Sequence, residues 1–202
     1  MTTQSVNIGG INISIPVYYQ AVKAMPGDPE NSKPYIVQTQ DATCFLVMHL
    51  LGKEQAMPMD EQMVIDGIHN ILSPKQGLIE VKKGPNYIYS IVKDLQEKKG
   101  VQYVLVFQKF FGDQVLSIHG YFDERGAFGV RDSMVYEICK REHIIGGEEN
   151  PLEGWAKDPY DPDFKRGILM NLSEAEKYDS LFPKSPLSMC REFLRVIMEE
   201  DE

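Results

Sequence analysis

The stretch that decides the fold is residues 100–142, GVQYVLVFQKFFGDQVLSIHGYFDERGAFGVRDSMVYEICKRE. It contains two runs rich in β-branched and aromatic residues, 103–111 and 114–122, which are separated only by Gly112 and Asp113. A two-residue loop that begins with glycine is typical of a type II′ turn, because glycine accepts the positive φ that this turn needs first. The sequence therefore predicts a β-hairpin and an antiparallel sheet.

A helix is predicted directly after this hairpin, over residues 130–142, with a turn at 123–126 between the two elements. Val130, Met134 and Ile138 recur at positions i, i+4 and i+8, which is the spacing of one face of a helix. We expect this stripe to be the buried face.

Further strands are predicted outward from the hairpin. A second hairpin is predicted around Gly9 and Gly10, because the run 11–15 alternates strictly between apolar and polar residues, as a strand with one buried face does. Other strand-like runs lie between clusters of Pro, Gly, Asp and Asn. They cover residues 35–39, 43–51, 77–83 and 87–95.

Another helix is predicted after Asp60, which is a suitable N-cap because its carboxylate can accept hydrogen bonds from the first turn. Apolar residues follow at helical spacing until Pro74 ends the pattern. The predicted buried positions are Val64, Ile68, Ile71 and Leu72.

The chain changes character in its C-terminal quarter. Residues 150–164 are rich in proline and aromatic residues, so we expect an extended strap across the core that buries its rings. Ser173 to Glu176 matches the capping box S-x-x-E, and Ser185-Pro186 is predicted to start a final helix. The strap rings are Trp155, Tyr160 and Phe164, and the last helix is expected to bury Leu187, Cys190, Leu194 and Ile197.

Together these patterns predict an α+β fold in which a mainly antiparallel sheet is flanked by helices. We expect two parts. Residues 1–146 are predicted to form the α/β core domain, and residues 147–202 an acidic extended strap with two short helices packing on that core.

The composition limits the classes of function. The chain has 202 residues and a formal net charge of −9. Most of the net negative charge lies after residue 146, where the sequence has 14 acidic and 7 basic residues. A sequence-independent grip on nucleic acid needs clustered Lys and Arg, so we expect no nucleic-acid partner.

Compartment and membrane signals point to the cytoplasm. The N-terminus lacks the basic and apolar regions of a secretory signal, and no apolar run approaches the roughly 20 residues that span a bilayer. The three cysteines, Cys44, Cys139 and Cys190, are far apart in the sequence, and an odd number cannot all form disulfides within the chain. Each lies in an apolar pattern, as buried reduced thiols do. We expect a cytoplasmic protein without disulfides or membrane contact.

Sequence motifs of catalysis and cofactor binding are absent. Neither phosphate-binding glycine loops nor H-E-x-x-H nor G-x-S-x-G occurs, and the four histidines are isolated. His119 is interpreted as structural and Cys44 as an inert thiol in an apolar run. We therefore predict no catalytic residue, no metal and no cofactor, although an enzyme with a dispersed site stays an alternative.

Polar residues at the junction between hairpin and helix form the candidate binding site. Carboxylates and a guanidinium group there could hold a peptide or close a metal site. The structural interpretation is that Arg131 pairs with Asp123 or Glu124 and that Asp132 favours the helix dipole. The candidate residues are Tyr121, Asp123, Glu124, Arg131 and Asp132.

The order of elements resembles the α/β/α sandwich of the PsbP-like superfamily. The resemblance rests on the strands at 89–92, 101–111 and 115–122 and covers roughly residues 5–142. That superfamily includes PsbP, the Ran-binding Mog proteins and bacterial effector-associated chaperones, so the resemblance implies protein binding rather than catalysis. The segments 172–179 and 182–188 depart from this pattern and look like an added module of an uncharacterised bacterial family.

Three functional hypotheses follow. The first is a non-catalytic cytoplasmic protein-binding module, such as a chaperone or adaptor for a secreted bacterial protein. The second is an immunity-type inhibitor whose acidic surface blocks a basic toxin site. The third is the enzyme with a dispersed site. A protein partner is expected in the first two, and the oligomeric state is left open.

Overall fold

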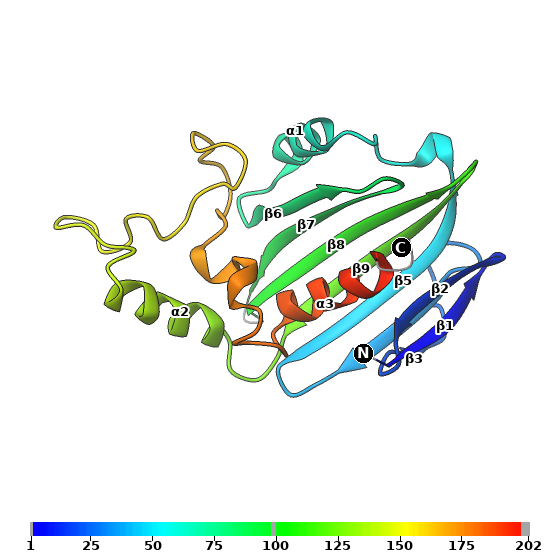
Figure 1. The fold of residues 1–202 in the computed structure, drawn as a ribbon, viewed down its shortest axis with the longest axis horizontal. Coiled ribbons are helices and arrows are strands. Elements are labelled where there is room, and N and C mark those ends of the chain that lie inside the picture. The colour runs from blue at the N-terminus through cyan, green and yellow to red at the C-terminus, as the bar shows by residue number, and fades with distance from the viewer. Residues whose placement is uncertain (1, 98–99, 199–202) are drawn as a thin grey trace.

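Seven antiparallel strands form one continuous sheet in the computed structural model, which describes residues 2–97 and 100–198 (Figure 1). With a separate two-stranded hairpin, the described residues contain nine strands: β1 (Thr3–Ile8), β2 (Ile11–Pro16), β3 (Gln20–Ala21), β4 (Lys33–Gln38), β5 (Ala42–Gly52), β6 (Gln76–Lys83), β7 (Tyr87–Gln96), β8 (Gly100–Phe111) and β9 (Gln114–Glu124). The seven-stranded sheet has the order β3-β4-β5-β9-β8-β7-β6, and β1 pairs with β2 in a separate hairpin.

Helices flank this sheet. The described residues form α1 (Glu61–Ile71), α2 (Val130–Arg141), α3 (Pro186–Met198) and the short 3-10 helices η1 (Lys53–Gln55), η2 (Leu172–Glu174) and η3 (Glu176–Tyr178). The predicted α+β class, with a mainly antiparallel sheet flanked by helices and a C-terminal helical extension, is confirmed. Within the described ranges no helix has the length and apolar character needed to cross a membrane.

The predicted central hairpin is confirmed as β8 and β9. Phe111 pairs with Gln114 across the turn, and Gly112 has a φ of 64°, the positive value for which glycine was expected. The two strands lie in the middle of the sheet, between β5 and β7.

Different helices cover the two faces of the sheet. Successive side chains on a strand point to opposite faces. On β7, Ile91 belongs to the main core with α3, whereas Ile88 and Val92 pack with α1. In Figure 1, α3 lies across the middle of the sheet and α1 lies beyond its β6 edge.

The buried face of α3 agrees with the prediction. Leu187, Cys190, Leu194 and Ile197 are at most 1% exposed, and Phe193 is fully buried beside them. The helix begins at Pro186, as expected. Since α3 occupies the centre of a sheet face, it contributes to the same hydrophobic cluster as β2, β5, β8 and β9.

The start of α1 also agrees, but its buried stripe is partly wrong. The Asp60 carboxylate accepts a hydrogen bond from the Met63 amide at 2.9 Å, which makes Asp60 the N-cap. Val64 and Leu72 are buried, whereas Ile71 is 79% exposed. The chain leaves the helix after Ile71, and α1 covers only the β6 side of its sheet face.

The predicted buried stripe of α2 is wrong by one position. Val130 and Met134 are 44% and 53% exposed, while Arg131, Val135 and Cys139 are buried. The second set has the same i, i+4, i+8 spacing, rotated by one residue. The difference arises because a charged residue, Arg131, begins the buried face.

Two C-terminal predictions need correction. The capping box is formed by Asn171 and Glu174 at the start of η2, two residues before the predicted Ser173, and it opens a single 3-10 turn. The strap at 150–164 runs beside α2 and toward α1 without crossing the core (Figure 1, yellow). Its rings Trp155 and Phe164 pack on Tyr136 and His69. Tyr160 stays 39% exposed, and its hydroxyl bonds to the backbone of Val81 on the edge strand β6.

The division at residue 146 stays a prediction. Within the described structure α3, which follows that boundary, packs into the main core.

Candidate functional site

A groove of about 1140 Å³ lies between α3, β4 and the segment 176–184, and we call it the α3 groove. Its lining includes the apolar side chains Tyr18, Ile36, Val37, Pro183 and Met189. Typical small-molecule pockets measure about 300–1,000 Å³, so this groove is larger than most of them.

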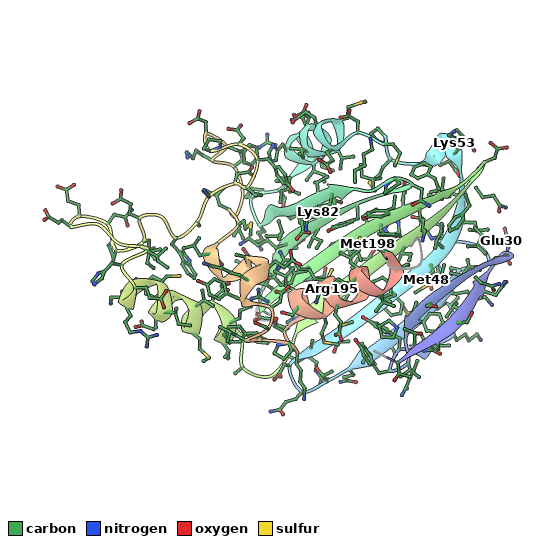
Figure 2. All side chains as sticks on the ribbon, in the orientation of Figure 1. Glu30, Met48, Lys53, Lys82, Arg195 and Met198 are labelled. Atoms are coloured by element: carbon green, nitrogen blue, oxygen red, sulfur yellow. The ribbon has the colours of Figure 1, made fainter. Side chains whose placement is uncertain are left out.

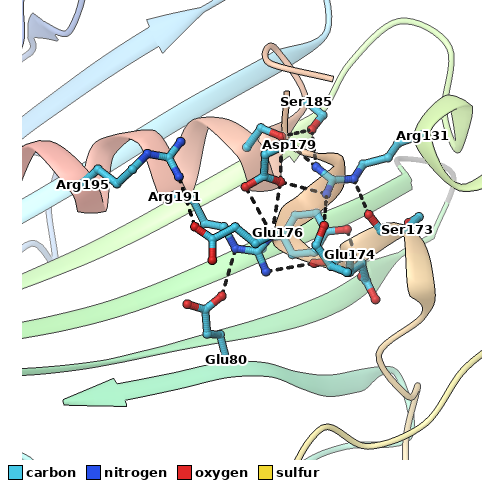
Figure 3. Close-up of polar contacts among 12 residues, drawn as sticks. Glu80, Arg131, Ser173, Glu174, Glu176, Asp179, Ser185, Arg191 and Arg195 are labelled. Atoms are coloured by element: carbon cyan, nitrogen blue, oxygen red, sulfur yellow. Dashed lines mark hydrogen bonds and ion pairs between the residues drawn. The ribbon is translucent and has the colours of Figure 1, made fainter. Parts of the chain in front are cut away.

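One wall of the α3 groove rests on a buried charge cluster centred on Asp179. Arg191 on α3 approaches Asp179 at 3.2 Å, and Arg131 on α2 approaches it at 2.9 Å. Figure 3 shows the two guanidinium groups reaching Asp179 from opposite sides. Asp179 is 7% exposed and lines the groove. It therefore connects the groove wall to both helices.

The same cluster reaches the sheet through Glu80 on β6. The Arg191 Nε atom lies 2.9 Å from the Glu80 carboxylate, which also accepts a hydrogen bond from Tyr89 at 2.6 Å. Burial raises the pKa of Glu80, but Arg191, Lys82 and Tyr89 outweigh it, so that the net pKa is lowered. Burial lowers the pKa of Arg191, but the carboxylates of Glu80 and Asp179 outweigh burial, so that the net pKa is raised. The pair is therefore charged at neutral pH.

A second buried branch holds the segment that precedes α3. Glu174 lies 2.8 Å from the Lys93 amine and accepts a hydrogen bond from the Tyr103 hydroxyl at 3.0 Å. Its carboxylate also accepts a hydrogen bond from the backbone N–H of Asn171 at 2.7 Å. Removing one partner of such a buried pair leaves a charge without compensation, which is strongly destabilising. This branch thus joins η2 to β7 and β8.

Charges of both signs surround the α3 groove. Arg195 on α3 and Lys82 on β6, both labelled in Figure 2, lie 3.5 Å and 3.6 Å from the Glu176 carboxylate. Glu192 accepts a hydrogen bond from the Tyr18 hydroxyl at 2.9 Å. Burial, and then Glu192, raises the pKa of Tyr18. In total the lining carries the acids Glu176, Asp179 and Glu192 and the bases Lys177, Lys184 and Arg195.

An open strand edge borders the α3 groove. β3 pairs with β4 only at Tyr35 and Ile36, so the described residues provide no strand partner beyond Ile36. The Thr39 amide donates to Ala42 in the direction of β5. Because backbone groups alternate along an antiparallel pair, those of the preceding residue, Gln38, point outward.

The residues predicted from sequence divide between two places. Tyr121 and Asp123 lie on the sheet face opposite α3, where Asp123 accepts a hydrogen bond from Gln102 at 2.8 Å. Glu124 accepts from the amides of Val101 and Gly129 at 3.0 and 3.1 Å. Burial raises the pKa of Glu124, and these two hydrogen bonds lower it less.

The predicted partner of Arg131 is wrong. Arg131 pairs with Asp179, and it also donates to the Ser173 carbonyl at 2.7 Å and the Ser188 hydroxyl at 2.8 Å. The cause is that its helix face turns toward the C-terminal segment. Asp132 accepts hydrogen bonds from Asn171 and Ser173 in the same segment. Whether these five residues bind a partner stays a prediction.

The α3 groove itself was not predicted from the sequence. Its walls come from residues 18–39 and 176–195, which are distant along the chain. One signal was available: Arg191 and Arg195 interrupt an apolar helix at a spacing of four residues, which indicates that one face of that helix meets acidic partners.

The acidic side chains, cysteines and histidines of the described residues are the groups that a metal or catalytic centre would use. No group of three or more His, Cys, Asp or Glu side chains in the described ranges is placed to hold a metal ion. Burial raises the pKa of Cys44 to about 12, which keeps its thiol protonated. Burial, and then the neighbouring His119, lowers the pKa of His49.

Comparisons with known proteins concern the fold. The Ran-binding protein Mog1p of Saccharomyces cerevisiae is 12% identical, with a TM-score of 0.46 over 68% of this chain and 84% of Mog1p. A Mog1 point mutant is 10% identical, with a TM-score of 0.47 over 98% of this chain and 94% of its own. The sequence matches no protein-family model and no curated protein. Similarity at this level is limited to the arrangement of helices and strands, and no functional conclusion follows from it.

Proposed function

We propose that this chain is a non-catalytic protein-binding module and that the α3 groove holds a segment of its partner. The observation that supports this proposal is one groove with an apolar lining and a rim of three acidic and three basic residues. A phosphate ligand needs an excess of positive groups, and a lipid chain needs an uncharged lining. A polypeptide segment can supply apolar side chains and both signs of charge.

Within this proposal the partner is a secreted bacterial protein, for which the chain serves as chaperone or adaptor in the cytoplasm. Cys44, Cys139 and Cys190 are buried free thiols, which supports a reducing compartment. The alternative partner is a toxin with a basic site, which the net charge of −9 would attract. High salt would weaken that complex much more than one based on apolar contacts.

The test is to block the α3 groove without disturbing the core. Ser180 lines the groove and is exposed, so Ser180→Trp fills space without entering the cluster around Asp179. The tagged full chain is used to capture partners from the cells that produce it. We expect a stoichiometric partner with the natural chain and its loss with Ser180→Trp.

Ser133→Trp is the matched control, because Ser133 is exposed on α2, outside the groove lining. It should capture the partner as the natural chain does. Capture that survives Ser180→Trp would exclude the α3 groove as the binding site. If the natural chain captures no stoichiometric partner, the protein-binding function itself is wrong.

Tyr121 and Asp123 remain a second proposed contact surface, on the other face of the sheet. Asp123→Asn tests it in the same capture experiment, since Asp123 is half-buried and its hydrogen bond joins only Gln102 on the neighbouring strand. Loss of capture with Asp123→Asn, at unchanged stability, would place the contact there.

A further inference from the structure

Some charged side chains of the α3 groove have an oppositely charged partner within the described residues, and others do not. Glu176 and Asp179 have cationic partners within the protein. Lys184 has no carboxylate partner among the described residues, and the contact found for Lys177 there is with the Tyr178 ring at 4.8 Å. Glu192 is bonded to a neutral hydroxyl, that of Tyr18. Two cations and one anion of the lining therefore remain available to a ligand.

Two of these available charges, Lys184 and Glu192, are separated along the axis of α3. Lys184 lies two residues before Pro186, the first residue of the helix, where the helix dipole is also positive. Lys177 lies nine residues before Pro186, in η3, and its neighbour Glu176 reaches Arg195 farther along α3. Glu192 lies six residues beyond Pro186, a distance of roughly 9 Å along the axis at about 1.5 Å per residue. An extended chain covers that distance in about three residues. The groove is thus positive at one end and negative one short peptide length away.

The other side of the groove can hold an extended backbone. The outward amide and carbonyl of Gln38 lie beyond Gln20, the first residue of β3. A partner segment that continues the line of β3 could pair with them, in the way that extended peptides add to exposed sheet edges. Between this edge and α3, the groove floor is apolar and is formed in part by Val37 and Met189, which are 9% and 4% exposed.

We infer, resting on the proposed function, that the α3 groove selects an extended segment of the partner with a defined charge order. The segment places an apolar side chain over Val37 and Met189. It places an acidic residue beside Lys184, and a Lys or Arg beside Glu192. The two charges are separated by about three residues.

A random linear peptide library displayed on phage, panned on the immobilised full chain, tests this inference. We expect enriched peptides to carry an apolar residue between an acidic and a basic residue. Synthetic versions should bind in fluorescence polarisation, and Ser180→Trp should abolish binding. Charge reversal with Glu192→Lys should weaken an enriched peptide about tenfold or more, because like charges then face each other. Replacing the basic residue of the peptide with Glu should restore the affinity.

Lys184→Glu tests the other end in the same way, and there an acidic-to-basic exchange in the peptide should restore binding. The matched controls are Glu137→Lys and Lys140→Glu on the exposed side of α2, which should change affinity less than twofold. All four variants change exposed or half-exposed side chains, and equal unfolding midpoints confirm intact folding.

Two failures are distinguishable. Suppose that Ser180→Trp abolishes peptide binding, whereas Glu192→Lys and Lys184→Glu leave the affinity unchanged. That result would overturn the charge order and leave the groove as the binding site. No enriched peptide, or enriched peptides that bind Ser180→Trp equally well, would overturn both the selected segment and the proposed groove function.

Discussion

α3 buries a face of apolar residues, whereas the buried face of α2 begins with an arginine. The comparison shows which buried helix faces a hydrophobic pattern can predict. α3 lies over the middle of the sheet, and its buried residues include Leu187, Phe193 and Ile197 in the main core. α2 lies beside the end of the sheet (Figure 1) and buries a narrow face against the segment around η2. That face begins with Arg131, which is 6% exposed.

The two helices nevertheless depend on one carboxylate. Arg131 from α2 and Arg191 from α3 both pair with Asp179, which belongs to neither helix. A buried carboxylate between two guanidinium groups fixes position and direction more strictly than apolar contact does. We therefore expect changes at Asp179 to affect both helices together.

The largest effect is predicted for Asp179→Ala. It leaves two buried guanidinium groups without their shared carboxylate, so the free energy of unfolding should fall by about 3–5 kcal/mol. Urea unfolding measures it. Glu137→Ala on the exposed face of α2 is the control and should change stability by less than about 0.5 kcal/mol. A loss below about 1 kcal/mol for Asp179→Ala would show that each helix is held by its apolar face alone.

The next effect tests which face of α2 is buried. Val135→Ala should cost about 2 kcal/mol, because it removes two buried methyl groups and leaves a cavity. Met134→Ala, one residue away and 53% exposed, should change stability by less than about 0.5 kcal/mol. Urea unfolding of both variants compares them directly. The reverse order would restore the stripe of Val130, Met134 and Ile138 as the buried face.

Local patterns predicted most of the sheet, because alternation and turn residues are encoded within a few neighbouring positions. The β8–β9 hairpin follows from Gly112, and α3 follows from Leu187, Cys190, Leu194 and Ile197, which recur at helical spacing on one side of the helix. The face of α2 could not be predicted in this way. Arg131 is buried only because Asp179 lies beside it in space, 48 residues later in the chain.

The candidate site was less accessible than the fold for the same reason. The α3 groove joins Tyr18 and β4 to a helix near the C-terminus, and no local signal states that they meet. Asp123, Glu124 and Arg131 lie near the junction of β9 and α2, but the bonds that they form are set by tertiary packing. Tyr121 lies on a different face from the groove.

A smaller effect concerns the pH dependence of the contact between α3 and the sheet. The folded-state pKa of Glu80 lies below its ordinary value of 4.5, so its contribution to stability is complete above that pH and is lost as the pH falls through the folded pKa. Glu80→Gln removes the titrating group. The difference in unfolding free energy between the natural chain and Glu80→Gln should be constant near pH 7 and shrink below about pH 4.5. A difference that does not change with pH would mean that Glu80 contributes through packing alone.

The smallest effect is predicted on the outer face of α3, at Arg195. This residue pairs with Glu176, and the two side chains are 47% and 56% exposed, so solvent screens their attraction. Arg195→Gln should therefore change the free energy of unfolding by less than about 1 kcal/mol, and a double-mutant cycle with Glu176→Gln should give a coupling in the same range. Arg191, four residues earlier, is 4% exposed and pairs with two buried carboxylates, so α3 has one arginine that anchors it and one that faces solvent. A coupling above about 2 kcal/mol would place Arg195 in the anchoring cluster. Weak coupling instead leaves the Glu176–Arg195 pair able to separate when a partner segment enters the α3 groove.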